Sequence, residues 1–159
     1  MRTAENLQAV VFRLGDEEFG VDITQVREID RLVRITRVPR VPSFVEGIIN
    51  LRGQLVPVLD LRTRLGLPRE PPPKTARIVV AEIDGRSLGM IVDEVREVVR
   101  IPADQIVESQ VVLEGLATEY VGAVAKIDQR VIVLLDVAKV LAGTAQEMPE
   151  ALRPDADKD

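Results

Sequence analysis

Carboxylates are the side chains of this chain that are best suited to acid–base chemistry. The 159 residues include no histidine and no cysteine, which removes the commonest general base, the thiol nucleophile and the usual zinc ligands. Asp60 and Asp136 stand out because each lies at the end of a similar short aliphatic run. If the fold brought the two carboxyl groups together, they could share a proton and serve an aspartic-type hydrolase.

Helix capping explains the same two residues more simply. An aspartate just before a helix accepts a hydrogen bond from a backbone N–H of the first turn. Short segments with helical apolar spacing follow both aspartates and end at Gly66 and Gly143, and neither aspartate is followed by the Thr-Gly that would seat a proton-sharing pair. We therefore expect two short capped helices, with the hydrolase using Asp60 and Asp136 as an alternative.

The elements that would position these residues are repeated along the chain. The segment 20–28, Gly-Val-Asp leading to Val-Arg-Glu, is matched 69 residues later by 89–97, Gly-Met-Ile leading to Val-Arg-Glu. The aliphatic run at 56–61 is matched 76 residues later by the run at 132–137. Both pairs keep the same order, which predicts one fold unit used twice.

Short strands separated by polar turns make up most of each half. The turns fall at 15–18, 52–53, 84–85 and 128–129, and Gly or Asp in them suits a tight hairpin. Regular short strands of this kind predict an all-β fold, and two small barrels of about five strands each, packed together, fit the duplication best.

Domain boundaries follow from the proline-rich segment 68–73, which we interpret as a stiff connector. The first barrel is expected at about 15–67 and the second at about 77–136, with terminal segments able to cross between them. The whole domain is expected to cover 9–143, with flexible ends at 1–8 and 144–159.

Composition narrows the possible functions. A net charge of −5 is opposite to the basic surface that nucleic acid requires, and no run approaches the roughly 20 apolar residues that span a bilayer. No Gly-rich phosphate cradle occurs, and three Phe and one Tyr are too few for a polyproline-binding groove. We therefore expect no catalytic residue, cofactor or metal ion, and a chain that presents surfaces to other proteins.

One basic segment departs from the acidic average. Arg31, Arg34, Arg37 and Arg40 recur every three residues with no acidic residue among them. Spaced surface charges usually form a solvated face, and an acidic partner is the alternative interpretation.

Several motifs together resemble the CheW-like family of bacterial chemotaxis coupling proteins. The resemblance extends over about 9–141, and it is carried by the motifs at 14–29, 47–53, 56–61 and 120–137. The most specific of them is the block Asn50-Leu51-Arg52-Gly53 in this setting.

This resemblance implies a pair of SH3-like five-stranded barrels and a non-enzymatic adaptor that links chemoreceptors to the histidine kinase CheA. In the family, the first barrel docks on the kinase's regulatory domain, a groove between the barrels takes the receptor's helical hairpin tip, and the second barrel contacts another kinase copy in the array. The resemblance also implies a monomer when free, in the cytoplasm, recruited to membrane-associated receptor arrays. A scaffold in a non-flagellar chemosensory pathway is the alternative.

Candidate binding residues follow from the matched motifs and from the pattern of aliphatics. Glu28 and Arg52 are the foremost candidates, because an ion pair between them would hold the binding face in shape, although a plain surface pair of little weight is the alternative. The groove aliphatics come from pattern alone, and any of them could instead belong to the core. The residues expected to bind the kinase are Val41, Phe44, Gly47, Asn50, Arg52 and Gly53. The residues expected to bind the receptor are Val10, Ile23, Val26, Glu28, Ile29, Val95 and Val98.

Overall fold

The computed structural model describes residues 6–107 and 118–148, so the expectations about 1–5 and 149–159 lie outside the described residues. Short hairpins dominate the chain, and the four that the turn signals predict are confirmed. The strands are β1 (Leu7–Leu14), β2 (Glu17–Asp22), β3 (Val26–Arg31), β4 (Val45–Leu51), β5 (Gln54–Asp60), β6 (Arg77–Ile83), β7 (Arg86–Val92), β8 (Glu94–Ile101), β9 (Ile106–Val107), β10 (Val121–Ile127) and β11 (Arg130–Leu135). The helices are α1 (Leu61–Arg64) and α2 (Val137–Glu147), with single 3₁₀ turns η1 (Ile23–Gln25), η2 (Ala103–Gln105) and η3 (Thr118–Tyr120).

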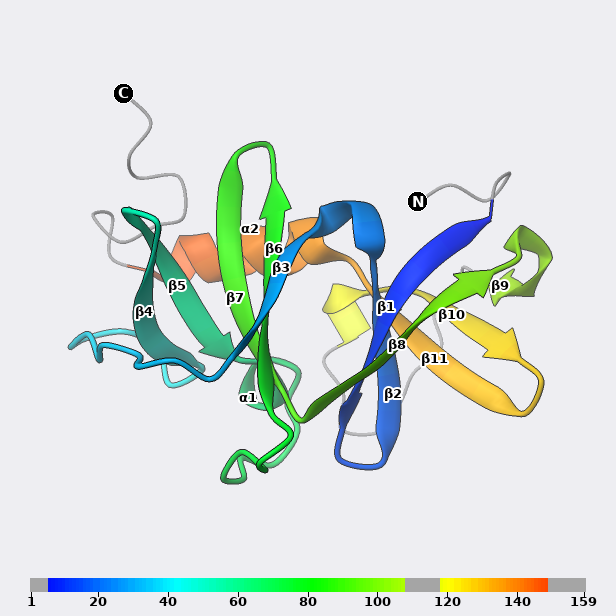
Figure 1. Ribbon diagram of the computed structural model, residues 1–159, viewed down its shortest axis with the longest axis horizontal. Helices are drawn as coiled ribbons and strands as arrows, with labels where there is room; N and C mark the ends of the chain where they lie inside the picture. The colour runs from blue at the N-terminus through cyan, green and yellow to red at the C-terminus, as the bar shows by residue number, and fades with distance from the viewer. Residues whose placement is uncertain (1–5, 108–117, 149–159) are drawn as a thin grey trace.

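The strands form two sheets, and each sheet closes into a small barrel (Figure 1). The central barrel has the order β3-β6-β7-β5-β4, and Thr36, which follows β3, closes it by exchanging two backbone hydrogen bonds of 2.9 Å with Ile48 on β4. The terminal barrel has the order β8-β1-β2-β11-β10-β9, and it closes because the chain continues from β8 into β9, which pairs with β10. The expectation of an all-β fold with two small barrels is confirmed. The expected five strands hold for the central sheet, whereas the terminal sheet has six strands among the described residues, because β8 and β9 are separate strands.

The two repeats exchange their first hairpins. Hairpin β1–β2 completes the terminal barrel beside β11, whereas β6–β7 completes the central barrel beside β5 (Figure 1). This order corrects the predicted division into 15–67 and 77–136, because the central barrel takes 26–92 and the terminal barrel takes both flanking segments. The connection from β7 to β8 favours the crossing in the second repeat, and the first repeat crosses through the three residues of η1. The β7–β8 connection consists of Asp93 alone, and since a hairpin loop needs about two residues, the chain runs on into the other barrel.

Two glycines show how the exchange preserves the repeat. Gly20 on β2 pairs in parallel with Leu134 on β11, and Gly89 on β7 pairs in the same way with Val58 on β5. A Cβ atom at either glycine would lie 3.1 Å from a methyl carbon of that partner. Glycine therefore recurs in both repeats because the parallel strands approach each other closely there.

The largest group of core side chains lies between the barrels. Each barrel has a small interior of its own, to which Val11 of β1 and Ile78 of β6 belong. Their neighbours Phe12 and Val79 point the other way and join one core shared by the two barrels. Strands β1 and β6 are thus buried on both faces, which is why each contains an unbroken apolar run.

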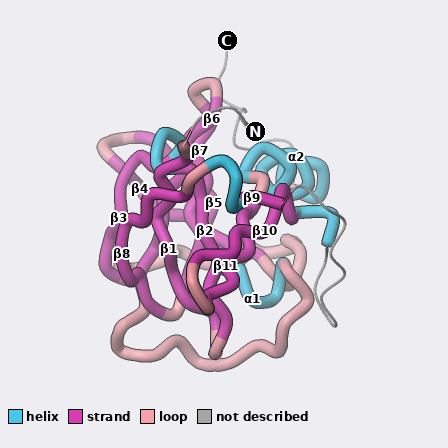
Figure 2. The backbone as a smooth tube through the Cα atoms, turned by 90° about the vertical axis from the view of Figure 1, so that its right-hand side faces the viewer, coloured by secondary structure: helices cyan, strands magenta, loops and turns pink. Residues whose placement is uncertain are grey.

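Two helices lie on one side of the strands (Figure 2). Helix α1 begins after Asp60 and α2 begins after Asp136, and each carboxylate accepts a hydrogen bond from a first-turn N–H, at 3.2 Å and 3.1 Å. The capping interpretation of both aspartates is therefore confirmed.

Helix α2 is longer than the sequence pattern indicates. It passes the expected end at Gly143, and Thr144 is fully buried, so residues 144–148 belong to the fold and not to a flexible tail. A Cβ atom at Gly143 would lie 2.6 Å from Nη2 of Arg64, so this glycine makes room for a side chain and does not end the helix. At the other end of the chain, β1 begins at Leu7, inside the segment expected to be flexible.

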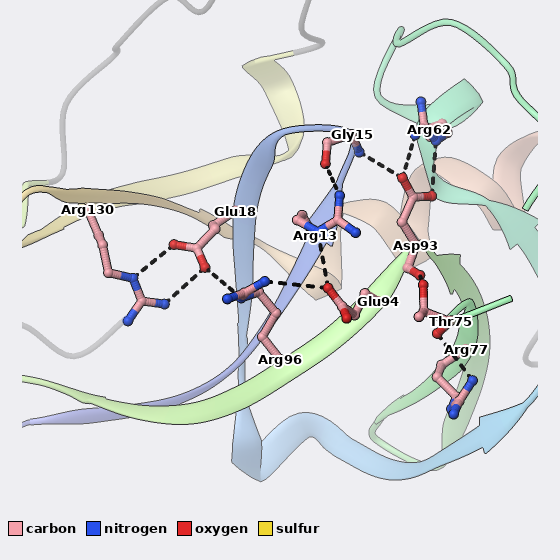
Figure 3. Close-up of polar contacts among 10 residues, drawn as sticks. All are labelled: Arg13, Gly15, Glu18, Arg62, Thr75, Arg77, Asp93, Glu94, Arg96 and Arg130. Carbon is pink, nitrogen blue, oxygen red and sulfur yellow. Dashed lines mark hydrogen bonds and ion pairs between the residues drawn. The ribbon is translucent and has the colours of Figure 1, made fainter. Parts of the chain in front are cut away.

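A polar clamp joins the two barrels where β7 passes into β8. The Asp93 carboxylate accepts a 2.7 Å hydrogen bond from the N–H of Gly15 and forms a buried ion pair with Arg62 on α1 (Figure 3). The Asp93 backbone donates to the Arg13 carbonyl at 3.0 Å and accepts from the Thr75 hydroxyl at 2.7 Å. Burial alone would raise the pKa of Asp93, but the hydrogen bonds from Arg62 and Gly15 outweigh burial and hold this pKa below its usual value.

A chain of ion pairs continues from the clamp along the terminal barrel (Figure 3). Arg13 pairs with Glu94, and Arg96 bridges Glu94 and Glu18. Arg130 holds Glu18 through two hydrogen bonds of 2.9 and 3.0 Å. Because these side chains are partly exposed, each pair contributes little alone, and the buried pair in the clamp matters most.

Replacement of Asp93 by Asn should lower the free energy of unfolding by about 3 kcal/mol, because the buried Arg62 would lose its counter-charge. Urea denaturation at pH 7 measures this change, and the control Glu94→Gln, in a partly exposed pair, should cost less than about 1 kcal/mol.

The lowered pKa of Asp93 means that its contribution to the free energy of unfolding is complete above about pH 4 and is lost as the pH falls through the folded-state pKa. Wild type should therefore lose more stability than Asp93→Asn between about pH 5 and pH 2. Equal stability of the two proteins at pH 7 would contradict the clamp.

Candidate partner-binding face

The β4–β5 turn and strand β3 place an arginine and a glutamate in direct contact. Arg52 and Gly53 have left-handed φ angles of 50° and 87°, and the Asn50 side chain fixes the turn by accepting a 2.8 Å hydrogen bond from the Gly53 N–H. Arg52 Nη1 donates to Glu28 Oε1 at 2.6 Å. Strands β3 and β4 stand at opposite ends of the sheet order, so closure of the barrel is what brings this pair together.

Neighbouring charged groups lower the pKa of the Glu28 carboxyl group. The carboxyl group of Asp30 and the guanidinium of Arg52 hold the pKa of Glu28 below its usual value, whereas Glu28 raises the pKa of Asp30. Arg27 donates to Gln54 at 2.7 Å, which ties β3 to β5, and its Nε lies 4.0 Å from Glu28 Oε1, where its charge also lowers the pKa of Glu28. The Arg52 side chain is 71% exposed and that of Glu28 is 19% exposed, so the pair presents a cationic group on a fixed base.

Sequence reasoning missed the part that Asp30 takes in this face. The signal was present, because residues i and i+2 of a strand point to the same side, and Asp30 lies two residues after Glu28 on β3.

The residues expected to bind the kinase divide into surface and structural groups. Phe44 is 6% exposed, and its ring lies 4.1 Å beneath the Arg64 guanidinium carbon. Val41 is half-buried against the shared core, and Gly47 is buried. The Phe44 side chain cannot contact a partner directly, which corrects that assignment. The exposed members of the set are Asn50, Arg52 and Gly53.

Gly47 has a role in barrel closure. Its φ angle is 152°, and a Cβ atom there would lie 2.1 Å from the carbonyl oxygen of Thr36. Thr36 is the residue that closes the central barrel through its bridge to Ile48. Only glycine leaves room for this backbone crossing.

The expected receptor-binding aliphatics occupy three different environments. Val10 is 2% exposed and faces the shared core, because β1 is buried on both faces, so its assignment to the groove is corrected. Ile29 on β3 and Val98 on β8 are 40% and 51% exposed and hold the same position in the two repeats. The half-buried residues that pack against the shared core are Ile23, Val26 and Val95.

The structure does not bring the two capping aspartates together. Asp60 lines a cavity of about 320 Å³ on the central barrel, where Arg69 approaches its carboxylate to 3.5 Å. Asp136 lines a different cavity, of about 110 Å³, beside Gly20 and Gly122. The geometry thus supports capping and gives no proton-sharing pair.

Residues 6–107 and 118–148 contain neither a candidate metal site nor a candidate membrane-spanning helix. Within those ranges, no group of three or more acidic, histidine or cysteine side chains is placed to hold a metal ion. No helix in the same ranges has the length and apolar character needed to cross a membrane.

The protein has two closed barrels on one shared core, an exposed turn fixed by hydrogen bonds, and an ion pair between β3 and the β4–β5 turn. These features define the class of protein. It is a scaffold that presents binding surfaces, in the manner of an adaptor. The CheW-like domain family matches residues 8–145, and the chain belongs to this family of chemotaxis adaptors.

Individual relatives agree with this assignment. The chain is 34% identical to the chemotaxis protein CheW of Klebsiella aerogenes over 133 residues, which cover 84% of this chain and 80% of that protein. It is 30% identical to the chemotaxis protein CheW of Bacillus subtilis over 141 residues, 89% of each chain. The crystal structure of the scaffolding protein TtCheW from Thermoanaerobacter tengcongensis matches with a TM-score of 0.78 and 40% identity, covering 82% of this chain and 88% of that one. These relatives favour a chemotaxis role over the non-flagellar alternative.

Replacement of Gly47 by Ala should lower the free energy of unfolding by about 3 kcal/mol, because the new methyl group would clash with the Thr36 carbonyl. Gly53→Ala is the matched control. Its Cβ would meet nothing within 4 Å, so only the left-handed φ is penalised, at about 1 kcal/mol. Thermal or urea unfolding measures both values, and a smaller loss for Gly47→Ala than for Gly53→Ala would refute the closure role.

Proposed function

We propose that this protein couples chemoreceptors to the histidine kinase CheA and supports assembly of the signalling array, as a free monomer of the cytoplasm that is recruited to membrane-associated receptors. The observation that carries the proposal is the Arg52–Glu28 contact. It joins, on one face, the two motif positions that the CheW-like resemblance relates to partner binding.

The kinase side of the proposal rests on the β4–β5 turn. A guanidinium has five N–H donors in a planar fork, and Glu28 engages Arg52 through one nitrogen. The remaining donors of this exposed group are suited to carboxylates or carbonyls of a regulatory domain. Because Asn50 and Glu28 hold the turn and the side chain in place, little ordering is required on binding.

The receptor side rests on the exposed aliphatics. Ile29 and Val98 lie on strands β3 and β8, each of which leaves the inter-barrel junction into a different barrel. The half-buried Val26 and Val95, on the same two strands, pack against the shared core. An amphipathic helical hairpin gains affinity by burying its own apolar side chains against such a surface.

Reconstitution tests the proposal. Receptor signalling domains and CheA should be combined with and without this protein, and kinase autophosphorylation and co-sedimentation with the receptor should be measured. We expect both to rise when the protein is present. Unchanged activity and retention, together with no direct binding to either partner, would defeat the proposal.

Arg52→Ala should weaken binding to the CheA regulatory domain while leaving the urea midpoint unchanged, because an exposed ion pair adds little to folding. The matched control is Lys126→Ala, which removes an exposed cation that has no ion pair among the described residues. Isothermal titration and urea denaturation measure the two effects. A large loss of fold stability in Arg52→Ala, with affinity per folded molecule intact, would show that the pair is structural.

A further inference from the structure

A cationic segment follows β3 without any acidic partner. The segment contains four exposed arginines: Arg31, Arg34, Arg37 and Arg40. None of their side chains makes an ion pair or hydrogen bond within residues 6–107 and 118–148. In contrast, the arginines of the clamp and of the ion-pair chain are all neutralised. Four uncompensated charges in a chain of net charge −5 form a local field of opposite sign to the rest of the molecule.

The barrel holds this segment in place. Arg31 is the last residue of β3 and pairs with β6, and Thr36 is bonded to Ile48 on β4. Between these anchors, Leu32 and Val33 are 38% and 48% exposed. Residues 31–36 therefore offer aliphatic and cationic groups together on a backbone that is already positioned, and Arg37 and Arg40 follow directly after the second anchor.

The second repeat has no equivalent of this segment. The positions 69 residues later hold one arginine, and its companions are neutral: Arg100, Ala103, Ile106 and Ser109. Two of the exposed apolar positions, however, recur in both repeats. Ile29 corresponds to Val98, and Leu55, which is 58% exposed, corresponds to Val131, which is 52% exposed. Apolar contacts at these two positions would therefore not distinguish one barrel from the other, whereas three of the four arginines and the exposed Leu32 and Val33 occur only in the first repeat.

We propose that Arg31, Arg34, Arg37 and Arg40 dock an acidic polypeptide surface of the kinase regulatory domain, and that this charge directs that domain to the central barrel in preference to the terminal barrel. The inference rests on the proposed function and deepens it. Charge complementarity of this kind fixes orientation and raises the association rate, whereas the apolar contacts supply most of the affinity.

Nucleic acid and anionic membrane fit the same segment less well. Both are extended polyanions, which the net charge of −5 repels as they approach. Binding of single strands also needs exposed aromatic rings, and Phe12, Phe19, Phe44 and Tyr120 are all buried. An acidic patch on a folded domain can approach the segment more closely than the Debye length, which is about 8 Å at physiological salt, so the attraction is little screened. The same domain can cover Leu32 and Val33.

The test uses two full-length variants of equal net charge. One replaces Arg31, Arg34, Arg37 and Arg40 by Ala. The control replaces four exposed cations elsewhere that have no ion pair among the described residues: Lys74, Arg100, Lys126 and Lys139. Binding to the CheA regulatory domain of the same organism is measured by titration at about 50, 150 and 500 mM NaCl, with urea unfolding as a check that both variants fold.

We expect the four-arginine variant to bind about tenfold more weakly at 50 mM salt, with a slower association rate, and the control to change less than about twofold. The difference should nearly vanish at 500 mM salt, where screening is strong. If wild type binds and both variants bind equally well, this inference fails and the proposed function stands. If wild type does not bind the kinase domain, both fail. Binding of wild type to duplex DNA or to phosphatidylglycerol vesicles at 150 mM salt, lost only in the four-arginine variant, would also overturn the inference.

Discussion

The exchange of hairpins between the two repeats is the constraint on which the rest of this structure depends. Each barrel is completed by two strands from the other repeat, so neither half of the sequence can form its barrel alone. The exchanged strands β1 and β6 carry one apolar face into their own barrel and the other into the shared core. Because burial of apolar surface is the main favourable term in folding, the largest single core and the relative placement of the barrels are established together.

Polar contacts then fix two features that the apolar core does not determine: the point where the chain changes barrels and the alignment of β3 with the β4–β5 turn. The Asp93 clamp fixes the point where the chain changes barrels, at a site whose charges are buried and matched. Closure at Thr36 and Ile48, with Gly47 making room for it, aligns β3 with the β4–β5 turn and thereby sets Arg52 beside Glu28. Since stability comes from these buried elements, the exposed arginines are available for recognition, which agrees with a family of adaptors.

Local features were readily predicted, because their causes lie within a few residues. Asp84-Gly85 and Arg52-Gly53 have the positive φ angles that tight turns need, and Asp60 caps the helix that follows it. The exposed turn at Asn50 and Arg52 also follows from a local hairpin motif, and its part in partner binding stays a prediction. Predictions failed where the cause was distant in sequence. Val10 is core because β6 and β7 pack near it, and Phe44 is covered by Arg64. The partners of Asp93 lie 31 and 78 residues away, and no local pattern indicates them.

The amino-acid sequence by itself determined most of the strands, the four hairpin turns, the capped starts of the two helices, the duplication and the family. Each of these depends on backbone preferences and side-chain spacing within short segments, which a chain carries before it folds. Only the tertiary structure decided which strands share a barrel, which aliphatics remain exposed, and that Glu28 meets Arg52. Those outcomes depend on contacts between distant segments and on sheets that close on themselves, so they arise only when distant parts of the chain pack together.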